Sequence, residues 1–205
     1  MEIKLCGLTR EEDIKNANEL LPEYIGFVFA NKSKRYISPE NALKLKQKLL
    51  PRIKAVGVFV DEDVKTIADY LNRGIIDMAQ LHGSEDEAYI KRFRVLTDKP
   101  IIKAFKIKSR DDLHGVQESS ADYILLDSGT GSGSVFDWDL IKSIERQYFL
   151  AGGLNPQNVE EAIRTLRPFA IDVSSGIETD GHKDPVKMKE FVNTARSVND
   201  RIRSR

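Results

Sequence analysis

Residues 148–176 read YFLAGGLNPQNVEEAIRTLRPFAIDVSSG, and this stretch decides the fold class. The apolar runs Tyr148–Gly152 and Ala170–Ser174 have the length and composition of buried strands. Between them, Asn155-Pro156 places proline at the first position of an amphipathic helix. A strand, a helix and a second strand in this order form a unit whose two strands lie parallel in one sheet.

The same alternation extends from this stretch toward both ends of the chain. Six further runs rich in Val, Ile, Phe and Leu each precede loop residues and a charged stretch. They are Glu2–Cys6, Tyr24–Phe29, Ala55–Val60, Met78–His82, Ile101–Phe105 and Tyr123–Asp127. Eight regular units without a dinucleotide-binding fingerprint favour a closed barrel over an open doubly wound sheet. We therefore predict an α/β fold, a single (β/α)8 or TIM barrel whose one domain spans residues 1–205.

Helix starts are marked by capping boxes or by a proline after a capping residue. These signals are Thr9 with Glu12, Ser84 with Glu87, Ser38-Pro39, Asn155-Pro156 and Asp184-Pro185. Asp63–Arg73 and Trp138–Arg146 predict two more helices, the third and the sixth. Residues 109–120 are polar and poorly periodic, so we expect the fifth helix to be short or degraded.

The composition argues against several classes of protein. Lys plus Arg equals Asp plus Glu at 32 each, so no overall field attracts nucleic acid or an anionic membrane, and we expect a small-molecule partner. The single cysteine, Cys6, excludes an internal disulfide and a Cys-rich zinc site, and three scattered histidines predict no metal site. No stretch resembles a transmembrane helix or a signal peptide, so we expect a cytoplasmic protein.

In a barrel of this type, functional residues gather where the strands end and the following loops begin. The seventh and eighth predicted strands, which are neighbours, end in Gly152-Gly153 and in Ser174-Ser175-Gly176. Glycine lets backbone N–H groups approach an anion closely, and barrel enzymes commonly bind phosphate after these two strands. The alternative is that these glycines only turn the chain. Two such turns on adjacent strands favour a phosphorylated ligand.

Cys6 and Asp127 end the first and sixth predicted strands. Taken alone, Cys6 is more often a buried small hydrophobe, but its place at a strand end before a glycine favours a thiol that transfers a proton. Asp127 closes an otherwise apolar strand, a setting that suits a general acid, and its alternative role is to hold the loop that follows. These strands lie three positions apart around the barrel, so the two groups should face each other across its mouth.

Three further side chains are candidates at the mouth. Arg35 by itself is an ordinary loop cation, whereas in a site it would bind a substrate carboxylate through two hydrogen bonds. His82 ends the fourth strand and is either a site residue or a satisfied hydrogen-bonding histidine. Lys4 lies on the same face of the first strand as Cys6, and Asp172 lies on the same face of the eighth strand as Ser174. We expect them to pair across the closing seam, which makes Asp172 partly structural.

These motifs belong to a longer series whose order and spacing run the length of the chain. The series comprises KLCGLTR from residue 4, GFVF from 26, SKRYI from 33, VGVFV from 56, QLHG from 80, GSGSVFDW from 131, LAGGL from 150 and DVSSGIE from 172. Each motif is weak alone, but the combination is highly specific. The chain resembles the phosphoribosylanthranilate isomerase family.

The resemblance implies an isomerase of tryptophan biosynthesis that works without metal or coenzyme. Its reaction is the Amadori rearrangement of N-(5-phosphoribosyl)anthranilate to 1-(2-carboxyphenylamino)-1-deoxyribulose 5-phosphate. The family pattern implies that Asp127 protonates the ribose ring oxygen as general acid and that Cys6 takes the C2 proton as general base. It also implies that Arg35 meets the anthranilate carboxylate. The other implied substrate-binding residues are Gly152, Gly153, Ser175 and Gly176 at the phosphate, with His82, Asp172 and Ser174 lining the site.

Two rival functions remain open from the sequence. The first is another phosphosugar enzyme on the same barrel. The sister isomerase of histidine synthesis needs an acidic residue at the fifth strand tip, where this chain has KAFKI without a carboxylate. Indole-glycerol-phosphate synthase needs a mouth rich in lysine and glutamate, which these strand tips lack. The second is a noncatalytic barrel that binds a phosphorylated ligand, which would not need an acid facing a base. Ser134 and residues 179–184 depart from the commonest family pattern, and we expect both in mobile loops. The oligomeric state is left open, with a monomer slightly favoured.

Overall fold

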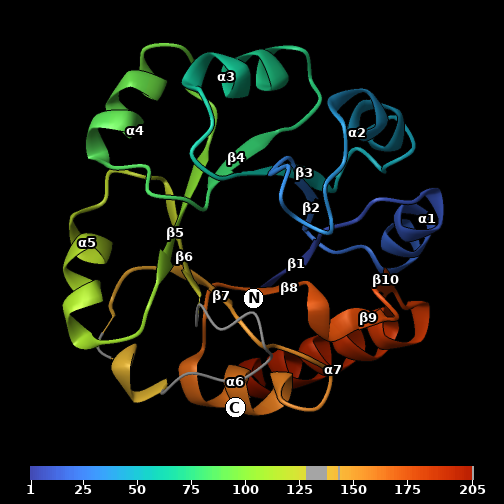
Figure 1. Cartoon of the computed structure of the whole chain (residues 1–205). Helices are drawn as coiled ribbons and strands as arrows, with labels where there is room; N and C mark the ends of the chain where they lie inside the picture. The colour runs from blue at the N-terminus through green and yellow to red at the C-terminus, as the bar shows by residue number, and fades with distance from the viewer. Residues whose placement is uncertain (128–137, 143, 205) are drawn as a thin grey trace.

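The computed structural model describes residues 1–127, 138–142 and 144–204, and its centre is a closed barrel of eight parallel strands (Figure 1). The strands are β1 (Glu2–Cys6), β2 (Tyr24–Val28), β3 (Lys54–Phe59), β4 (Met78–Leu81), β5 (Ile101–Lys106), β6 (Tyr123–Asp127), β7 (Tyr148–Ala151) and β8 (Ala170–Val173). Strands that are neighbours in sequence pair with each other, and β1 pairs with β8 to close the barrel. All eight predicted strands are confirmed, each end within one residue.

Helices surround the strands as an outer ring (Figure 1). The α-helices of the described part are α1 (Glu11–Leu20), α2 (Pro39–Lys46), α3 (Val64–Asn72), α4 (Glu87–Arg94), α5 (Leu113–Glu118), α6 (Val159–Leu166) and α7 (Pro185–Arg203). Three short 3-10 turns accompany them, η1 (Arg110–Asp112), η2 (Trp138–Leu140) and η3 (Ser175–Ile177). The fifth helix is short, as predicted. The loop that contains Ser134 lies outside the described residues.

The helix starts were predicted less well than the strands. Ser38 and Asp184 cap α2 and α7 with proline next to them, so these two starts are confirmed. The predicted capping box of Thr9 with Glu12 is wrong. Instead, the carboxylate of Asp13 accepts the backbone N–H groups of Thr9 and of the residue after it, both at 3.0 Å. The residue that caps the start of α1 is therefore Asp13, one position after the predicted Glu12.

The second predicted capping box, Ser84 with Glu87, is also wrong. The Ser84 hydroxyl donates to Asp61 at 2.7 Å, so it serves the loop after β3 rather than α4. The actual cap of α4 is Asp86, whose carboxylate accepts the N–H of Tyr89 at 2.8 Å. In both helices an aspartate other than the predicted residues binds the unpaired N–H groups, Asp13 at α1 and Asp86 at α4.

Two further helix predictions, both in the C-terminal half of the chain, are corrected. The predicted start at Asn155-Pro156 is wrong, because the Asn155 side chain holds a turn and α6 begins only at Val159. The predicted sixth helix, Trp138–Arg146, is reduced to η2. Its last residue explains part of this: the Arg146 guanidinium donates to three backbone carbonyl oxygens of the preceding connection, which holds this end of the segment without a helical ladder.

The barrel interior is apolar near the N-terminal ends of the strands. Side chains alternate along each strand between the interior and the helices. In this lower part, the rings of Tyr24, Tyr123, Phe149 and Phe169 contact one another with centroids 5.4 to 5.8 Å apart. The aromatic cluster fills this end of the barrel. Polar inward-facing residues are therefore left to the opposite end.

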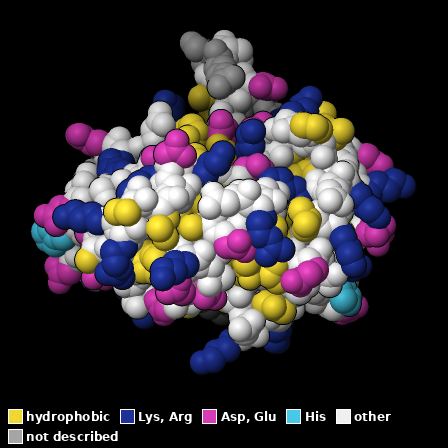
Figure 2. Space-filling view, turned by 90° about the horizontal axis from the view of Figure 1, so that it is seen from above, with side chains coloured by type: hydrophobic (Ala, Val, Ile, Leu, Met, Phe, Trp, Pro, Cys, Tyr) yellow, Lys and Arg dark blue, Asp and Glu magenta, His cyan; other side chains and the backbone are white. Residues whose placement is uncertain are grey.

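The surface carries charges of both signs. Figure 2 shows Lys and Arg side chains interspersed with Asp and Glu over one face, with hydrophobic side chains in small groups between them. No helix in the described part of the chain is long and apolar enough to cross a membrane.

Candidate active site

A cavity of 310 Å³ opens at the C-terminal ends of the strands. The alternation of side chains along the strands points polar groups into it, above the apolar lower interior. Every predicted site residue except Gly176 lines this cavity: Cys6, Arg35, His82, Asp127, Gly152, Gly153, Asp172, Ser174 and Ser175. The barrel thus brings together residues that lie up to 169 positions apart in the sequence, from Cys6 to Ser175 (175 − 6 = 169).

The Cys6 thiol faces the barrel interior and is 7% exposed. Beside it, on the neighbouring strand β2, lies Gly26, where an added Cβ would come within 2.6 Å of the sulfur. Burial raises the pKa of the Cys6 thiol; the Lys4 ammonium group acts against this, Asp172 adds to it, and Lys183 opposes it again. The net pKa is raised, so the resting group at neutral pH is the thiol, with two ammonium groups placed to stabilise a thiolate.

Lys4 and Asp172 form a buried ion pair across the seam where the barrel closes. Lys4 Nζ donates to Asp172 Oδ2 at 2.9 Å, and the two residues are direct partners in the pairing of β1 with β8. The predicted pair is therefore confirmed. Burial by itself lowers the pKa of Lys4, but the neighbouring carboxylate and thiol raise it above its ordinary value. The ammonium group of Lys4 thus lies beside the Cys6 sulfur.

Asp127 belongs to a chain of hydrogen bonds that starts on β4. Gln80 Nε2 lies 2.8 Å from His82 Nδ1, and His82 Nε2 lies 3.1 Å from Asp127 Oδ2. An amide nitrogen can only donate, so with the amide in this orientation Nδ1 accepts and Nε2 carries the hydrogen that is donated to Asp127. Gln80 and Asp127 thus hold the imidazole ring of His82 from both sides, and His82 contacts the carboxyl group of Asp127.

Arg35 forms an ion pair with Glu178 at the rim of the cavity. Its Nε and Nη2 atoms donate to the two carboxylate oxygens of Glu178 at 2.6 and 2.7 Å. Lys183 Nζ donates to Glu178 Oε1 at 2.6 Å. Glu178 and Lys183 belong to a short hairpin, β9 (Glu178–Thr179) and β10 (His182–Lys183), which occupies most of the predicted loop.

The loops after β7 and β8 meet beside the cavity. Gly152 and Gly153 have φ values of 86° and 68°, a conformation that other residues rarely adopt. Gly176 follows Ser175 directly but is not itself among the residues that line the cavity. A Cβ at this position would lie 1.9 Å from the carbonyl oxygen of Leu154, so only glycine lets the two loops pack together. The loops therefore form one joint surface with Ser175.

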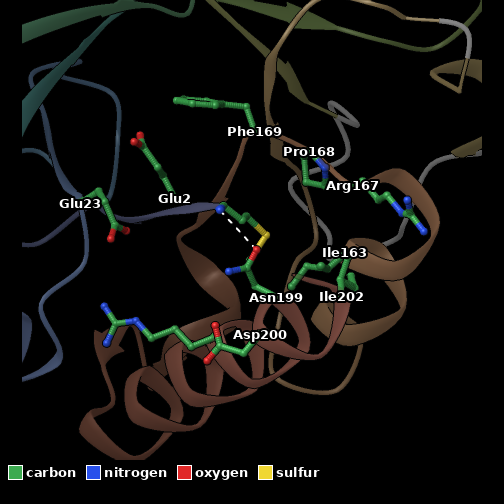
Figure 3. A pocket seen from close by; sticks show the side chains of 11 residues that line it. Glu2, Glu23, Ile163, Arg167, Pro168, Phe169, Asn199, Asp200 and Ile202 are labelled. Carbon is green, nitrogen blue, oxygen red and sulfur yellow. Dashed lines mark hydrogen bonds between the residues drawn. The ribbon is translucent and has the colours of Figure 1, made fainter. Parts of the chain in front are cut away.

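A larger cavity, of 650 Å³, lies at the opposite end of the barrel (Figure 3). Figure 3 shows Glu2, Glu23 and Phe169 on one side of it and Asn199 and Asp200 of α7 on the other. The dashed line marks the N-terminal amino group donating to Asn199 Oδ1 at 3.4 Å. None of the predicted site residues lines this cavity, and its described walls contain neither a thiol nor an imidazole.

Sequence reasoning missed four residues of the site region. Gln80 had a usable signal, because it lies two positions before His82 and so faces the same way. Gly26 becomes informative only once its place beside the thiol is known. Glu178 and Lys183 had no local signal, because Glu178 contacts Arg35 from the other half of the chain and Lys183 contacts Ser174 and Glu178 only in the folded hairpin. In the described ranges, no group of three or more His, Cys, Asp or Glu side chains is placed to hold a metal ion.

The fold and the cavity define a (β/α)8-barrel enzyme whose polar groups converge at the C-terminal ends of the strands. The family model described as N-(5'phosphoribosyl)anthranilate (PRA) isomerase matches residues 3–194. The chain belongs to the phosphoribosylanthranilate isomerase family, whose members are Amadori-type isomerases of tryptophan biosynthesis.

Individual relatives agree with the family model. The N-(5'-phosphoribosyl)anthranilate isomerase of Thermoanaerobacter sp. (strain X514) is 46% identical over 208 residues, which cover 97% of this chain and 99% of the relative. The crystal structure of the Thermotoga maritima isomerase has a TM-score of 0.89 and 38% identity, and covers 96% of this chain and 99% of its own. A solved isomerase complex with reduced 1-(o-carboxyphenylamino)-1-deoxyribulose 5-phosphate has a TM-score of 0.86, with the same identity and coverage.

Proposed function

We propose that the chain converts N-(5-phosphoribosyl)anthranilate to 1-(2-carboxyphenylamino)-1-deoxyribulose 5-phosphate, with Asp127 as general acid and Cys6 as general base. The observation that carries the proposal is that both groups line one 310 Å³ cavity, from strands three positions apart around the barrel. The solved relative whose complex contains the reduced product supports the same ligand class.

In the first step, the carboxyl group of Asp127 donates a proton to the ring oxygen of the ribose. The bond between C1 and this oxygen breaks, its electron pair goes to the oxygen, and the nitrogen lone pair forms a C1=N double bond. The product is an open-chain protonated Schiff base. The hydrogen bond from His82 Nε2 orients the carboxyl group for this transfer.

In the second step, the Cys6 thiolate removes the proton from C2. The electron pair of that C–H bond forms C1=C2, and the C1=N electrons return to nitrogen, which yields the neutral enolamine. Loss of the hydroxyl proton at C2 and protonation of C1 then give the ketone. Lys4 stabilises the thiolate form of the base, because its buried ammonium group lies beside the sulfur.

The two charged ends of the substrate have separate binding regions in this proposal. The phosphate binds at the loops after β7 and β8, to backbone groups of Gly152, Gly153, Ser175 and Gly176. The anthranilate carboxylate binds to the guanidinium group of Arg35. The remaining contacts to the ribose come from His82, Asp172 and Ser174.

The test follows the anthranilate fluorescence of freshly generated substrate, with and without purified protein, in chelator-treated buffer. We expect rapid loss of substrate fluorescence with the wild-type chain. Cys6→Ser and Asp127→Asn should each lose about 10³-fold in kcat, because each removes a proton transfer. Both should still bind the reduced product, since the phosphate and carboxylate contacts remain. Glu23→Gln in the opposite cavity is the matched control and should keep full turnover.

Two results would contradict the proposal in different ways. Retained turnover in Cys6→Ser or Asp127→Asn would remove the role assigned to that residue and leave the reaction in place. No turnover by folded wild-type protein would remove the reaction, and the search would move to other phosphorylated sugars that fit the same cavity.

We also propose that residues 1–205 act as one catalytic domain, in the cytoplasm and as a monomer. One solved relative, from Thermotoga maritima, is described as dimeric. The interspersed charges of the face in Figure 2 support a monomer for this chain. Light scattering coupled to gel filtration tests it: a mass near 23.2 kDa is expected, and twice that mass would overturn it.

A further inference from the structure

Glu178 lies next to the cavity without lining it. Its carboxylate binds Arg35 through two hydrogen bonds, at 2.6 and 2.7 Å, and this pair connects residues 143 positions apart in sequence. The Glu178 side chain is 11% exposed and that of Arg35 is 30% exposed. Arg35 lines the cavity, and Glu178 is not among the lining residues. Arg35 is therefore the member of the pair that borders the cavity.

The geometry of the pair leaves one edge of the guanidinium group for a ligand. A guanidinium carries five N–H groups in a fixed plane, and Glu178 uses one on Nε and one on Nη2. Within the described residues, no carboxylate or carbonyl accepts from Nη1 of Arg35. The edge formed by Nη1 and the second hydrogen of Nη2 has the spacing that a carboxylate needs for two parallel hydrogen bonds.

Neighbouring groups hold both partners in place. An added Cβ at Gly7 would lie 2.5 Å from Cδ of Arg35, so the absence of a side chain there lets the arginine stem pass. Lys183 Nζ donates to Glu178 Oε1 at 2.6 Å, and Lys187 Nζ donates to the Glu178 carbonyl oxygen at 2.7 Å. Burial by itself raises the pKa of Glu178, but hydrogen bonds from Arg35 and Lys183 lower it, so the carboxylate is ionised.

We infer that Glu178 is a positioning residue for substrate recognition: it holds one edge of Arg35 and thereby presents the other edge to the carboxylate of the substrate. The inference rests on the proposed function, which places the anthranilate carboxylate at Arg35. Glu178 keeps its ion pair when the ligand binds and does not compete with it. Recognition of a carboxylated ring therefore depends on a residue that does not touch the ligand.

The test compares two ligands on one variant. Binding of reduced 1-(o-carboxyphenylamino)-1-deoxyribulose 5-phosphate and of its counterpart without the carboxyl group is measured by calorimetry on the wild type and on Glu178→Gln. We expect roughly tenfold weaker binding of the carboxylated ligand to the variant, the effect of losing one well-oriented charge-assisted contact. The ligand without the carboxyl group should bind both proteins equally. In turnover, KM should rise by a similar factor while kcat changes much less.

Two further variants separate positioning from folding. Thr179→Val removes the 2.6 Å hydrogen bond from Thr179 to Asp184 in the same hairpin and leaves Glu178 unchanged. It should bind both ligands as the wild type does, whereas a purely structural role of the hairpin would weaken both. Glu178→Asp keeps the charge on a shorter side chain and should recover part of the lost affinity. It also stands in for Glu178→Gln if that protein does not fold.

Three results would overturn the inference. Tighter binding of the carboxylated ligand to Glu178→Gln would mean that Glu178 competes with the substrate for Arg35. Equal weakening of both ligands would mean that the hairpin only shapes the site. Unchanged binding of both would mean that Arg35 is positioned without Glu178. Failure of the proposed function is distinguishable from all three, because wild-type protein would then neither turn over the substrate nor prefer the carboxylated ligand.

Discussion

The two ends of the barrel each contain a cavity, and the smaller one contains the groups suited to catalysis. The cavity at the N-terminal ends of the strands measures 650 Å³ and the one at the C-terminal ends 310 Å³. At the larger cavity, the polar groups are bound to nearby structure: Glu2 accepts from the Tyr24 hydroxyl at 2.5 Å, and Arg196 donates to the carbonyl oxygen of Leu21 at 2.6 Å. Cavity size therefore says little about where the chemistry lies.

The smaller cavity differs in that charged groups are buried around it. Lys4 is fully buried, Asp172 is 8% exposed and Lys183 is 4% exposed, and all of them lie near one thiol. Burying charges costs free energy that their pairing only partly offsets, so such a cluster is not explained by stability. The comparison teaches that buried ionisable groups gathered around a cavity, and not the volume of the cavity, identify the functional end of the barrel.

The largest effect should come from breaking the buried pair at the seam. Lys4→Met leaves the Asp172 carboxylate buried without its partner, and we expect a loss of about 3 kcal/mol or more in the free energy of unfolding. Urea denaturation measures it. Arg196→Met at the other cavity removes a hydrogen bond to a carbonyl oxygen and should cost about 1 kcal/mol.

The double variant Lys4→Met with Asp172→Asn sharpens this result. It removes the unpaired charge and should recover a large part of the lost stability, because the penalty comes from the isolated carboxylate. If Lys4→Met and Arg196→Met cost the same, the two ends of the barrel would not differ in the way described above.

The next effect concerns the space beside the thiol. Gly26→Ala would place a methyl group 2.6 Å from the Cys6 sulfur, which must then move. We expect kcat to fall by up to about a hundredfold with little change in KM, since displacement of a reacting atom by about 1 Å has an effect of this size. Steady-state kinetics on the purified variant measures both constants.

Gly57→Ala is the matched control for this variant. An added Cβ at Gly57 would lie 2.7 Å from Cδ1 of Ile76 and 2.8 Å from the ring of Phe59, an equally close contact away from the thiol. It should lower stability and leave kcat of the folded protein unchanged. Equal losses of kcat in both variants would show that crowding in the sheet, not the position of the sulfur, causes the effect.

How far the sequence predicts this molecule depends on the range of the interactions involved. The strands were predictable to within one residue because buried parallel strands are continuous apolar runs. The pair of Lys4 with Asp172 was predictable because strand faces and barrel closure define it. The caps of α1 and α4 were not, because Asp13 and Asp86 replaced the expected residues at the helix starts.

The site residues also divide into those that the sequence predicts and those that it does not. Residues at strand ends, such as Cys6 and Asp127, were placed correctly at the mouth because a barrel gathers strand ends by construction. Glu178 was missed, since its contact with Arg35 exists only after the hairpin of β9 and β10 has folded against the loop that follows β2. Contacts between two loops leave no periodic pattern in the sequence.

The smallest predicted change is a pH dependence that distinguishes the two ends. Burial raises the pKa of the Cys6 thiol, so below that pKa only a fraction of the molecules carries the thiolate base. The reactive form carries this thiolate together with a protonated Asp127, so we expect kcat/KM to rise as pH increases over the range in which Asp127 stays protonated, by up to about tenfold for each pH unit below the thiol pKa. Initial rates from anthranilate fluorescence, corrected for the reaction without protein, measure it.

The N-terminal end supplies the contrast for this measurement. Burial and the hydrogen bond to Glu2 raise the pKa of the Tyr24 hydroxyl far above its ordinary value, so Tyr24 stays protonated throughout the assay range. Tyr24→Phe should therefore leave the pH profile unchanged, whereas a variant that moves the charge beside Cys6 should shift it. A wild-type rate that falls as pH increases through the neutral range, under conditions where chemistry limits turnover, would mean that the base is not a thiol with a raised pKa. The role of Cys6 would then need another activating group within the same cavity.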